Sequence, residues 1–299
     1  MQLDTRVSGK TKLTGLIGNP IEHTISPVLQ NSLFSMMGID GIYVPVKVPQ
    51  GKLGDAVCGL KASGFTGFNV TIPYKEEVLQ FLDDISDEAV LLGAVNTVKV
   101  SGDKLYGYNT DGDGFLRAFR EQTESGFEGK LVCILGAGGT ARALTAKIAT
   151  AGVERITVIN RTPERAQELS LNVNSILEER GLGKITVPAG LDSLEAADAL
   201  EACDVIINTT SAGMYPKVVN SPLKDDFRFR SEQIVYDVIY NPAETKLLAQ
   251  AKKSGCRTAN GAGMLFYQGV RAFEIWMETA IPDTKLRDLS AVFVKYLAE

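Results

Sequence analysis

The chain has 299 residues, of which 44% are hydrophobic and 22% charged, so it is long enough for two domains with separate cores. Its 31 basic and 36 acidic side chains give a net charge of −5 without a basic block, which argues against nucleic acid as a partner. Four scattered cysteines without a CxxC pair, and the single histidine His23, argue against a zinc site, so we expect no metal. Unpaired thiols, and apolar runs far below the roughly 20 residues of a membrane span, predict a cytoplasmic protein with no membrane contact.

Short apolar strands alternate with amphipathic helices along the chain, a pattern typical of an α/β fold with largely parallel sheets. In the first third, the predicted strands cover residues 13–17, 42–48 and 65–72. The predicted helices cover residues 26–37, 51–62 and 74 to about 82, and a shorter helix begins at Ser86. Two further short strands over residues 97–100 and 105–108 form a predicted hairpin. We expect a domain boundary between residues 111 and 129.

A second series of strands and helices begins in this boundary region. The predicted strands cover residues 130–135, 155–159, 185–187, 205–208 and 234–238, and the predicted helices cover about 114–122, 142–151, 163–180, 264–277 and 286–297. Because the first strand of this series is followed directly by a glycine-rich turn and a helix, it opens a βαβ pattern.

That glycine-rich turn, GAGGTA at residues 136–141, is typical of a dinucleotide-binding loop when it lies between a strand and a helix. Gly136 permits the tight turn, and Gly138 lets the backbone approach a pyrophosphate at the start of the helix. Ala141, at the third glycine position, is small enough for the helix to pack on its strand. An ordinary glycine-rich turn is the alternative interpretation.

The end of the next strand distinguishes NADP from NAD. An NAD site usually carries Asp or Glu roughly 20 residues beyond the loop, where the carboxylate binds the ribose 2′-hydroxyl. Here the strand ends in Asn160, Arg161 and Thr162, followed by Arg165, without a carboxylate. The two arginines can hold a 2′-phosphate through charge-assisted hydrogen bonds, so the sequence favours NADP. Solvated surface arginines are the alternative.

Polar side chains stand at the ends of several elements predicted in the first third. They are Thr24, Ser26, Asn69, Thr71, Lys75, Asn96, Thr97 and Asp111. Helix caps, turn residues or a solvated lysine would explain each of them separately. However, Lys75 falls at the expected start of a helix after a buried strand, a setting that disfavours a charged ammonium. With Asp111 beside it, Lys75 could pass a proton to or from a substrate hydroxyl during hydride transfer.

With these residues the chain closely resembles the shikimate dehydrogenase family. The matching segments, in family order, are GNPIEHTISP at 18–27, NVTIPYKE at 69–76, GAVNT at 93–97, YNTDG at 108–112, GAGGTAR at 136–142, NRT at 160–162, DVIYNP at 237–242 and MLFYQG at 264–269. They lie within residues 13–277 and so cover nearly the whole chain.

The resemblance implies an N-terminal α/β substrate domain over residues 1–113, joined by the C-terminal helices 265–299. A Rossmann-type NADP-binding domain would cover residues 114–264, with the active site in the cleft between the domains. It further implies an enzyme that reversibly reduces 3-dehydroshikimate to shikimate with NADP, in chorismate and aromatic amino-acid biosynthesis.

The same resemblance assigns roles to individual residues. Lys75 and Asp111 would form the catalytic acid–base pair. The substrate would be bound by Thr24, Ser26, Thr71, Asn96, Asp111, Tyr240 and Gln268. NADP would be bound by Gly136, Ala137, Gly138, Gly139, Thr140, Asn160, Arg161, Thr162 and Arg165, with Asp87, Val238 and Gly261 as lesser contacts.

One departure leaves two alternatives within the enzyme class. The family most often has serine where this chain has Thr24, and the extra methyl group changes the space near the substrate carboxylate. A dual quinate/shikimate dehydrogenase that uses NAD or NADP is therefore an alternative. A non-catalytic NADP-binding sensor is a remoter one, because Lys75 and Asp111 are both present. The expected partner is a small-molecule substrate, and the oligomeric state, a homodimer included, is left open.

Overall fold

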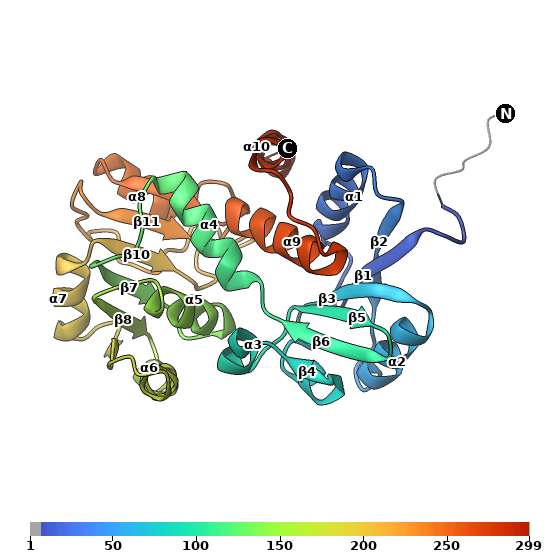
Figure 1. Cartoon of the computed structure of the whole chain (residues 1–299). Helices are drawn as coiled ribbons and strands as arrows, with labels where there is room; N and C mark the ends of the chain where they lie inside the picture. The colour runs from blue at the N-terminus through green and yellow to red at the C-terminus, as the bar shows by residue number, and fades with distance from the viewer. Residues whose placement is uncertain (1–6, 299) are drawn as a thin grey trace. The chain divides into compact units, whose positions relative to one another are not determined.

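The computed structural model describes residues 7–298 and divides into two compact units. The first comprises the chain up to Thr110 together with Gln268–Leu289, and the second comprises Asp111–Tyr267 together with the stretch from Ser290 onward (Figure 1). The domain limits expected from the sequence stay a prediction. Within the described residues, no helix is long and apolar enough to cross a membrane.

The first unit is built on a mixed sheet with the strand order β2-β1-β3-β5-β6-β4. Its strands are β1 (Lys12–Gly18), β2 (Gly41–Lys47), β3 (Phe65–Val70), β4 (Asp84–Ile85), β5 (Thr97–Ser101) and β6 (Lys104–Tyr108). β1 pairs in parallel with both β2 and β3, whereas β5 runs antiparallel to β3 and to β6. The carboxyl ends of β1 and β3, the start of β5 and the end of β6 therefore lie at one edge of the sheet.

Helices cover both faces of this sheet. They are α1 (Ser26–Met37), α2 (Leu53–Ala62), the 3-10 helix η1 (Glu77–Phe81), α3 (Asp87–Leu92) and the last part of α9 (Ala262–Met277). Phe68 packs in one cluster with residues of α2, η1 and α3, and its neighbour Gly67 faces the opposite side. There the Trp276 ring lies against Gly67, where a Cβ would approach it to 2.2 Å, so only glycine fits. The indole Nε1 donates to the Val98 carbonyl at 2.9 Å, which fixes α9 on this face.

The second unit carries a parallel sheet with the order β12-β11-β10-β7-β8-β9. Its strands are β7 (Leu131–Leu135), β8 (Arg155–Asn160), β9 (Thr186–Gly190), β10 (Val205–Asn208), β11 (Ile234–Asp237) and β12 (Arg257–Asn260). This order is that of a doubly wound dinucleotide-binding fold, and it reverses direction between β7 and β10. Ligands of such sheets bind outside the carboxyl ends of the strands at this switch point.

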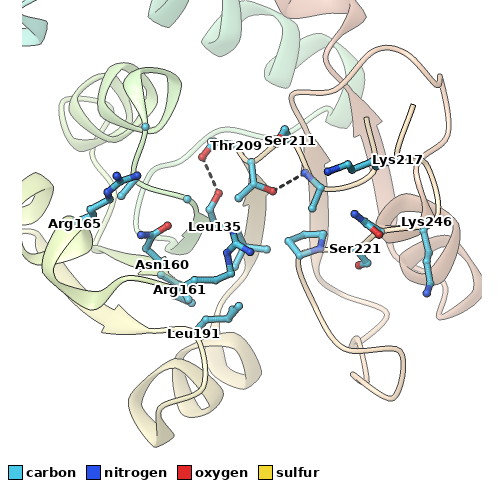
Figure 2. A pocket seen from close by; sticks show the side chains of 18 of the residues that line it. Leu135, Asn160, Arg161, Arg165, Leu191, Thr209, Ser211, Lys217, Ser221 and Lys246 are labelled. Atoms are coloured by element: carbon cyan, nitrogen blue, oxygen red, sulfur yellow. Dashed lines mark hydrogen bonds between the residues drawn. The ribbon is translucent and has the colours of Figure 1, made fainter. Parts of the chain in front are cut away.

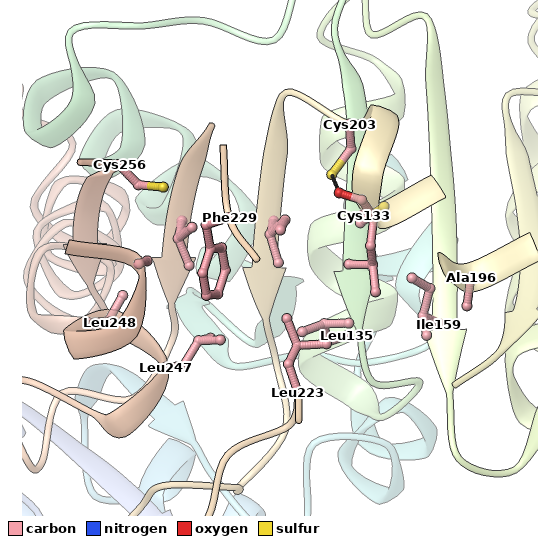
Figure 3. Packing of buried hydrophobic residues seen from close by; sticks show 14 of the residues in the cluster. Cys133, Leu135, Ile159, Ala196, Cys203, Leu223, Phe229, Leu247, Leu248 and Cys256 are labelled. Atoms are coloured by element: carbon pink, nitrogen blue, oxygen red, sulfur yellow. Dashed lines mark hydrogen bonds between the residues drawn. The ribbon is translucent and has the colours of Figure 1, made fainter. Parts of the chain in front are cut away.

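Helices also pack on both faces of the second sheet. They are α4 (Asp111–Thr123), α5 (Gly139–Ala149), α6 (Pro163–Glu179), α7 (Leu194–Ala202) and α8 (Lys246–Lys253), and the last helix of the chain is α10 (Asp283–Ala298). Figure 3 shows one of the two packed layers, where Cys133 and Leu135 of β7 belong to one cluster with Ala196 of α7 and Leu248 of α8. Because side chains alternate along a strand, Val132 and Ile134 are buried on the opposite face.

The predicted fold class is confirmed, but some of the expected elements differ. Residues 74–82 do not form an α-helix: turns run from residue 72 to residue 76, and η1 follows. The buried Tyr74 side chain, whose hydroxyl donates to the Val48 carbonyl at 2.8 Å, anchors this turn against the propensity of the segment. Four short elements, α7, α8, β4 and β12, are not predicted from the sequence, and each has nine residues or fewer.

Candidate active site

Sheet topology gathers the polar residues of the first unit at one edge. Thr24 and Thr71 follow the carboxyl ends of the parallel strands β1 and β3. Asn96 immediately precedes β5, and Thr110 follows β6, so both residues return to the same edge. Asp111, the next residue, is the first residue of α4.

A hydrogen-bond network links buried residues of β2, β3 and β5 with Asn96 and Thr110 at this edge. The Tyr43 hydroxyl donates to Asn69 Oδ1 at 2.8 Å. Asn69 Nδ2 donates to the Asn96 carbonyl and to Thr97 Oγ1, each at 3.0 Å. The network therefore runs from β2 through β3 to the start of β5.

Asn96 carries the network on to the residue before Asp111. Its Nδ2 donates to Thr110 Oγ1 at 3.0 Å, and its Oδ1 accepts from the Thr110 amide at 2.9 Å. Asn96 and Thr110 are 3% and 1% exposed, so water does not compete with these bonds. These bonds hold Thr110, the last residue before α4, against Asn96.

Tyr43 is a residue of this network that the sequence analysis missed. It lies in β2 and is 1% exposed, and burial raises the pKa of its hydroxyl far above the usual range. Its side chain packs near Trp276, with ring centroids 6.0 Å apart. Only the pairing of β2 with β1, which is not local in sequence, brings Tyr43 to the polar residues.

Lys75 lies in the turn between β3 and η1, and its setting differs from the expected one. The structure places no α-helix start there, so the helix-dipole argument for Lys75 does not apply. Instead, the Val95 amide donates to the Lys75 carbonyl at 2.8 Å, which joins this turn to the residue before Asn96. The backbone that carries the half-buried Lys75 side chain is thus held by the Val95 amide and by the anchored Tyr74 next to it.

Thr24 and Ser26 do not cap the helix that they precede. The N-cap residue of α1 is Ile25, and the helix start makes no side-chain capping bond. Thr24 Oγ1 instead accepts the Ser26 amide at 3.3 Å. The Thr24 hydroxyl therefore binds the first amide of α1 from outside the N-cap position, Ser26 makes no capping bond, and a carboxylate-binding role for both stays a prediction.

The remaining predicted substrate residues lie in different parts of the chain. Thr71 packs against Gly18, where a Cβ would approach Thr71 Cγ2 to 2.3 Å. Gln268 lies on α9 in the first unit. Tyr240 follows β11 in the second unit, and partial burial raises the pKa of its hydroxyl.

A cavity of ≈ 860 Å³ opens at the switch point of the second sheet (Figure 2). It is lined by residues at or after the carboxyl ends of β7, β8, β9 and β10 and by the first residue of α8: Leu135, Gly136, Ala137, Gly138, Ile159, Asn160, Arg161, Arg165, Leu191, Thr209, Thr210, Ser211, Ala212, Lys217, Val219, Asn220, Ser221, Pro222 and Lys246. The predicted cofactor residues Gly136, Ala137, Gly138, Asn160, Arg161 and Arg165 are among them.

The other predicted cofactor residues do not line this cavity. Gly139 and Thr140 begin α5, and Thr162 directly precedes α6. Val238 and Gly261 lie side by side beyond β11 and β12, where a Cβ on Gly261 would come within 1.9 Å of the Val238 carbonyl oxygen. Asp87 begins α3 in the first unit.

The chemistry of the cavity fits a dinucleotide with several phosphates. Its lining, among the described residues, includes four cationic side chains and no carboxylate, in a chain with a net charge of −5. Gly136 has a φ of +112°, which favours glycine, and a Cβ at Gly138 would meet nothing within 4 Å. The start of α5 makes no side-chain capping bond, which leaves its first amides available to an anion, as at other helix starts that bind phosphate.

The sequence analysis missed the part of the lining that follows β10. This part includes Thr209, Ser211 and Lys217, and Lys246 of α8 adds a further cation. The strand order explains why, because β10 pairs directly with β7 although about 70 residues separate them.

Comparison with known proteins agrees with this geometry. The profile described as shikimate dehydrogenase substrate binding domain matches residues 16–98, and the one described as shikimate / quinate 5-dehydrogenase matches residues 119–221. Shikimate dehydrogenase (NADP(+)) of Moorella thermoacetica is 44% identical over 289 residues, covering 95% of each chain.

Solved structures extend the agreement to the fold. Shikimate 5-dehydrogenase from Listeria monocytogenes, in complex with shikimate and NAD, has a TM-score of 0.88 at 34% identity, covering 96% of this chain and 99% of that one. The enzyme from Thermus thermophilus, in complex with NADP(H) and shikimate, has a TM-score of 0.81 at 30% identity, covering 95% and 100%. Since the likeness spans both units and nearly all of each chain, this chain belongs to the shikimate dehydrogenase family.

Proposed function

We propose that this chain is an NADP-dependent shikimate dehydrogenase, which reversibly reduces 3-dehydroshikimate to shikimate. The observation that carries the proposal is the cavity of the second unit, in which Arg161 and Arg165 stand after β8 and the described lining holds no carboxylate. Such a lining suits the 2′-phosphate of NADP and lacks the acidic residue that usually binds the ribose of NAD. The relatives that share the whole chain are named for this activity.

In the proposed reaction, NADP supplies or accepts the hydride, and side chains of this chain manage the proton and the substrate. Lys75 holds the proton that moves to or from the substrate oxygen, and Asp111 orients the Lys75 ammonium. Thr24 and Ser26 bind the substrate carboxylate through their hydroxyls. Asn69 and Asn96 supply amide groups at the same sheet edge, held by the network described above.

The remaining assignments are also proposals. Thr71, Tyr240 and Gln268 bind the substrate, and the cofactor residues outside the cavity complete the NADP site. Residues 1–113 with 265–299 form the substrate domain, and residues 114–264 form the NADP-binding domain. The cysteines are free thiols, which suits an enzyme of the cytoplasm.

The test is the formation of NADPH by purified protein with shikimate and NADP, repeated with quinate and with NAD. Turnover that is fast only with shikimate and NADP supports the proposal. Comparable kcat/KM values with quinate or NAD would instead make the chain a dual-specificity enzyme and would overturn the selectivity assigned to Arg161. If the chain bound NADP but turned over no combination of substrate and cofactor, it would be a non-catalytic NADP-binding sensor.

A further inference from the structure

The four cationic side chains of the nucleotide cavity differ in their ion pairing. Lys246 is neutralised by Asp225, with Nζ and Oδ1 2.6 Å apart. Among the residues that the structure describes, the other three, Arg161, Arg165 and Lys217, face no carboxylate within ion-pair distance. Arg161 and Arg165 are accounted for by a 2′-phosphate, whereas nothing in the proposed function so far uses Lys217.

The strand order places Lys217 on the other side of the glycine loop from these arginines. β7, which leads into the glycine loop, lies between β8 and β10. Arg161 and Arg165 follow β8, and Lys217 belongs to the segment that follows β10. Figure 2 shows Arg165 and Lys217 on opposite sides of the cavity. A ligand lying across the carboxyl ends of these strands would meet the arginines first, then the loop amides, then Lys217.

The segment that carries Lys217 is ordered by its own hydrogen bonds. The Lys217 amide donates to the Met214 carbonyl at 2.8 Å, and the Asn220 amide donates to the Lys217 carbonyl at 3.2 Å. The Tyr215 amide donates to the Asn241 carbonyl at 3.3 Å, which ties the turn to the chain after β11. The lysine therefore projects from a fixed turn, and an ammonium without a carboxylate partner among the described residues is available there to an anionic ligand.

We infer that Lys217 binds the pyrophosphate of the dinucleotide, on the side opposite to the start of α5. This inference rests on the proposed use of NADP. The α5 amides and the Lys217 ammonium would approach the two phosphates from different directions. The hydrogen bonds from both donors would be strengthened by the negative charge of the pyrophosphate. Arg161 and Arg165 would bind the 2′-phosphate, which only NADP carries. Because both dinucleotides contain the pyrophosphate, Lys217 would contribute affinity for NADP and NAD alike.

Binding of nucleotides to Lys217→Met, measured by isothermal titration calorimetry at constant ionic strength, tests the inference without relying on turnover. We expect the Kd values for NADP and for NAD to rise by the same factor, about tenfold, since one charge-assisted bond is lost. Adenosine 2′-monophosphate, which has no pyrophosphate, should bind the variant as it binds the unsubstituted chain. Lys217→Arg should retain most of the affinity.

Lys224→Met is the matched control, because Lys224 is an exposed lysine close in sequence that pairs with Asp192 and does not line the cavity. This variant should bind both nucleotides normally. Two results for Lys217→Met would overturn the inference. If the variant bound NADP and adenosine 2′-monophosphate more weakly but NAD normally, Lys217 would bind the 2′-phosphate instead. If all Kd values were unchanged, Lys217 would bind neither phosphate group. If the unsubstituted chain failed to bind NADP at all, both the proposed function and the inference about Lys217 would be wrong.

Discussion

At the scale of single residues, the Tyr43 hydroxyl holds the Asn69 side chain, whose amide is hydrogen-bonded to residues at the edge of the sheet. Tyr43→Phe keeps the buried ring but leaves Asn69 Oδ1 without the hydroxyl that donates to it. We expect a loss of about 1–3 kcal/mol in the free energy of unfolding, because a buried polar group becomes unsatisfied. The KM for shikimate should rise, while the Kd for NADP stays constant because Tyr43 does not line the nucleotide cavity.

Urea unfolding and steady-state kinetics measure both effects. Tyr296→Phe is the control, since Tyr296 is 48% exposed on α10 and its replacement should change the stability by less than about 0.5 kcal/mol. A Tyr43→Phe variant with unaltered stability and unaltered KM would show that the network does not support the substrate site.

Lys75 is the general acid–base group of the proposed reaction. Lys75→Ala should lower kcat at least about 100-fold, because proton transfer at the substrate oxygen loses its general acid–base group. The Kd for NADP should change little. Lys52→Ala, at an exposed lysine paired with Asp55, provides the comparison and should retain full activity. An unaltered kcat for Lys75→Ala would remove Lys75 from the mechanism.

At the scale of the elements, the segment after β10 depends on a buried carboxylate at the end of β11. Asp237 is 0% exposed, and burial raises its pKa from 3.8 to about 6 despite three hydrogen-bond donors. Asn208 Nδ2 donates to Asp237 Oδ1 at 3.0 Å, and Thr245 Oγ1 donates to Oδ2 at 2.7 Å. Asn208 Oδ1 in turn accepts the Thr210 amide at 3.0 Å, so the carboxylate fixes the start of the cavity-lining segment.

This raised pKa predicts how stability depends on pH. The folded state binds the Asp237 proton more tightly than the unfolded state, so this contribution is fully present below the unfolded pKa of 3.8 and is lost as pH rises through about 6. The free energy of unfolding, relative to that of Asp237→Asn, should therefore fall by about 3 kcal/mol between acidic and neutral pH. Chemical unfolding of both proteins across this range measures the difference. A difference independent of pH would contradict the assignment.

Local patterns predict those elements whose side chains repeat strongly, and they fail where distant contacts decide. The glycine loop and the arginines after β8 could be predicted because their spacing within one βαβ unit is short. Lys75 was placed at a helix start because Pro73 and the residues after it resemble one, but the buried Tyr74 fixes turns instead. Tyr43 and Lys217 enter their sites only through strand pairings, which no local pattern specifies.

At the scale of the whole molecule, local charge rather than net charge determines where an anion binds. The chain carries a net charge of −5, yet one cavity holds only cationic and neutral side chains among the described residues. Each compact unit has its own six-stranded sheet within the described part of the chain and its own hydrophobic cluster, as for Phe68 in the first unit and Leu135 in the second. Two ligands of different chemistry are thereby assigned to separate scaffolds.

Hydrogen exchange should show that NADP and shikimate protect amides of different units. A ligand that binds only the folded form suppresses local opening of the segments that it contacts. We expect NADP to protect mainly amides of residues 136–141 and 209–222, which border the nucleotide cavity. Shikimate should protect mainly residues 18–27 and 71–76, which follow β1 and β3. Deuterium uptake measured by mass spectrometry with each ligand alone resolves the two patterns, and adenosine 2′-monophosphate serves as the control that should spare residues 209–222. Protection by shikimate centred on residues 136–141 would contradict the assignment of substrate to the first unit, because that segment belongs to the second.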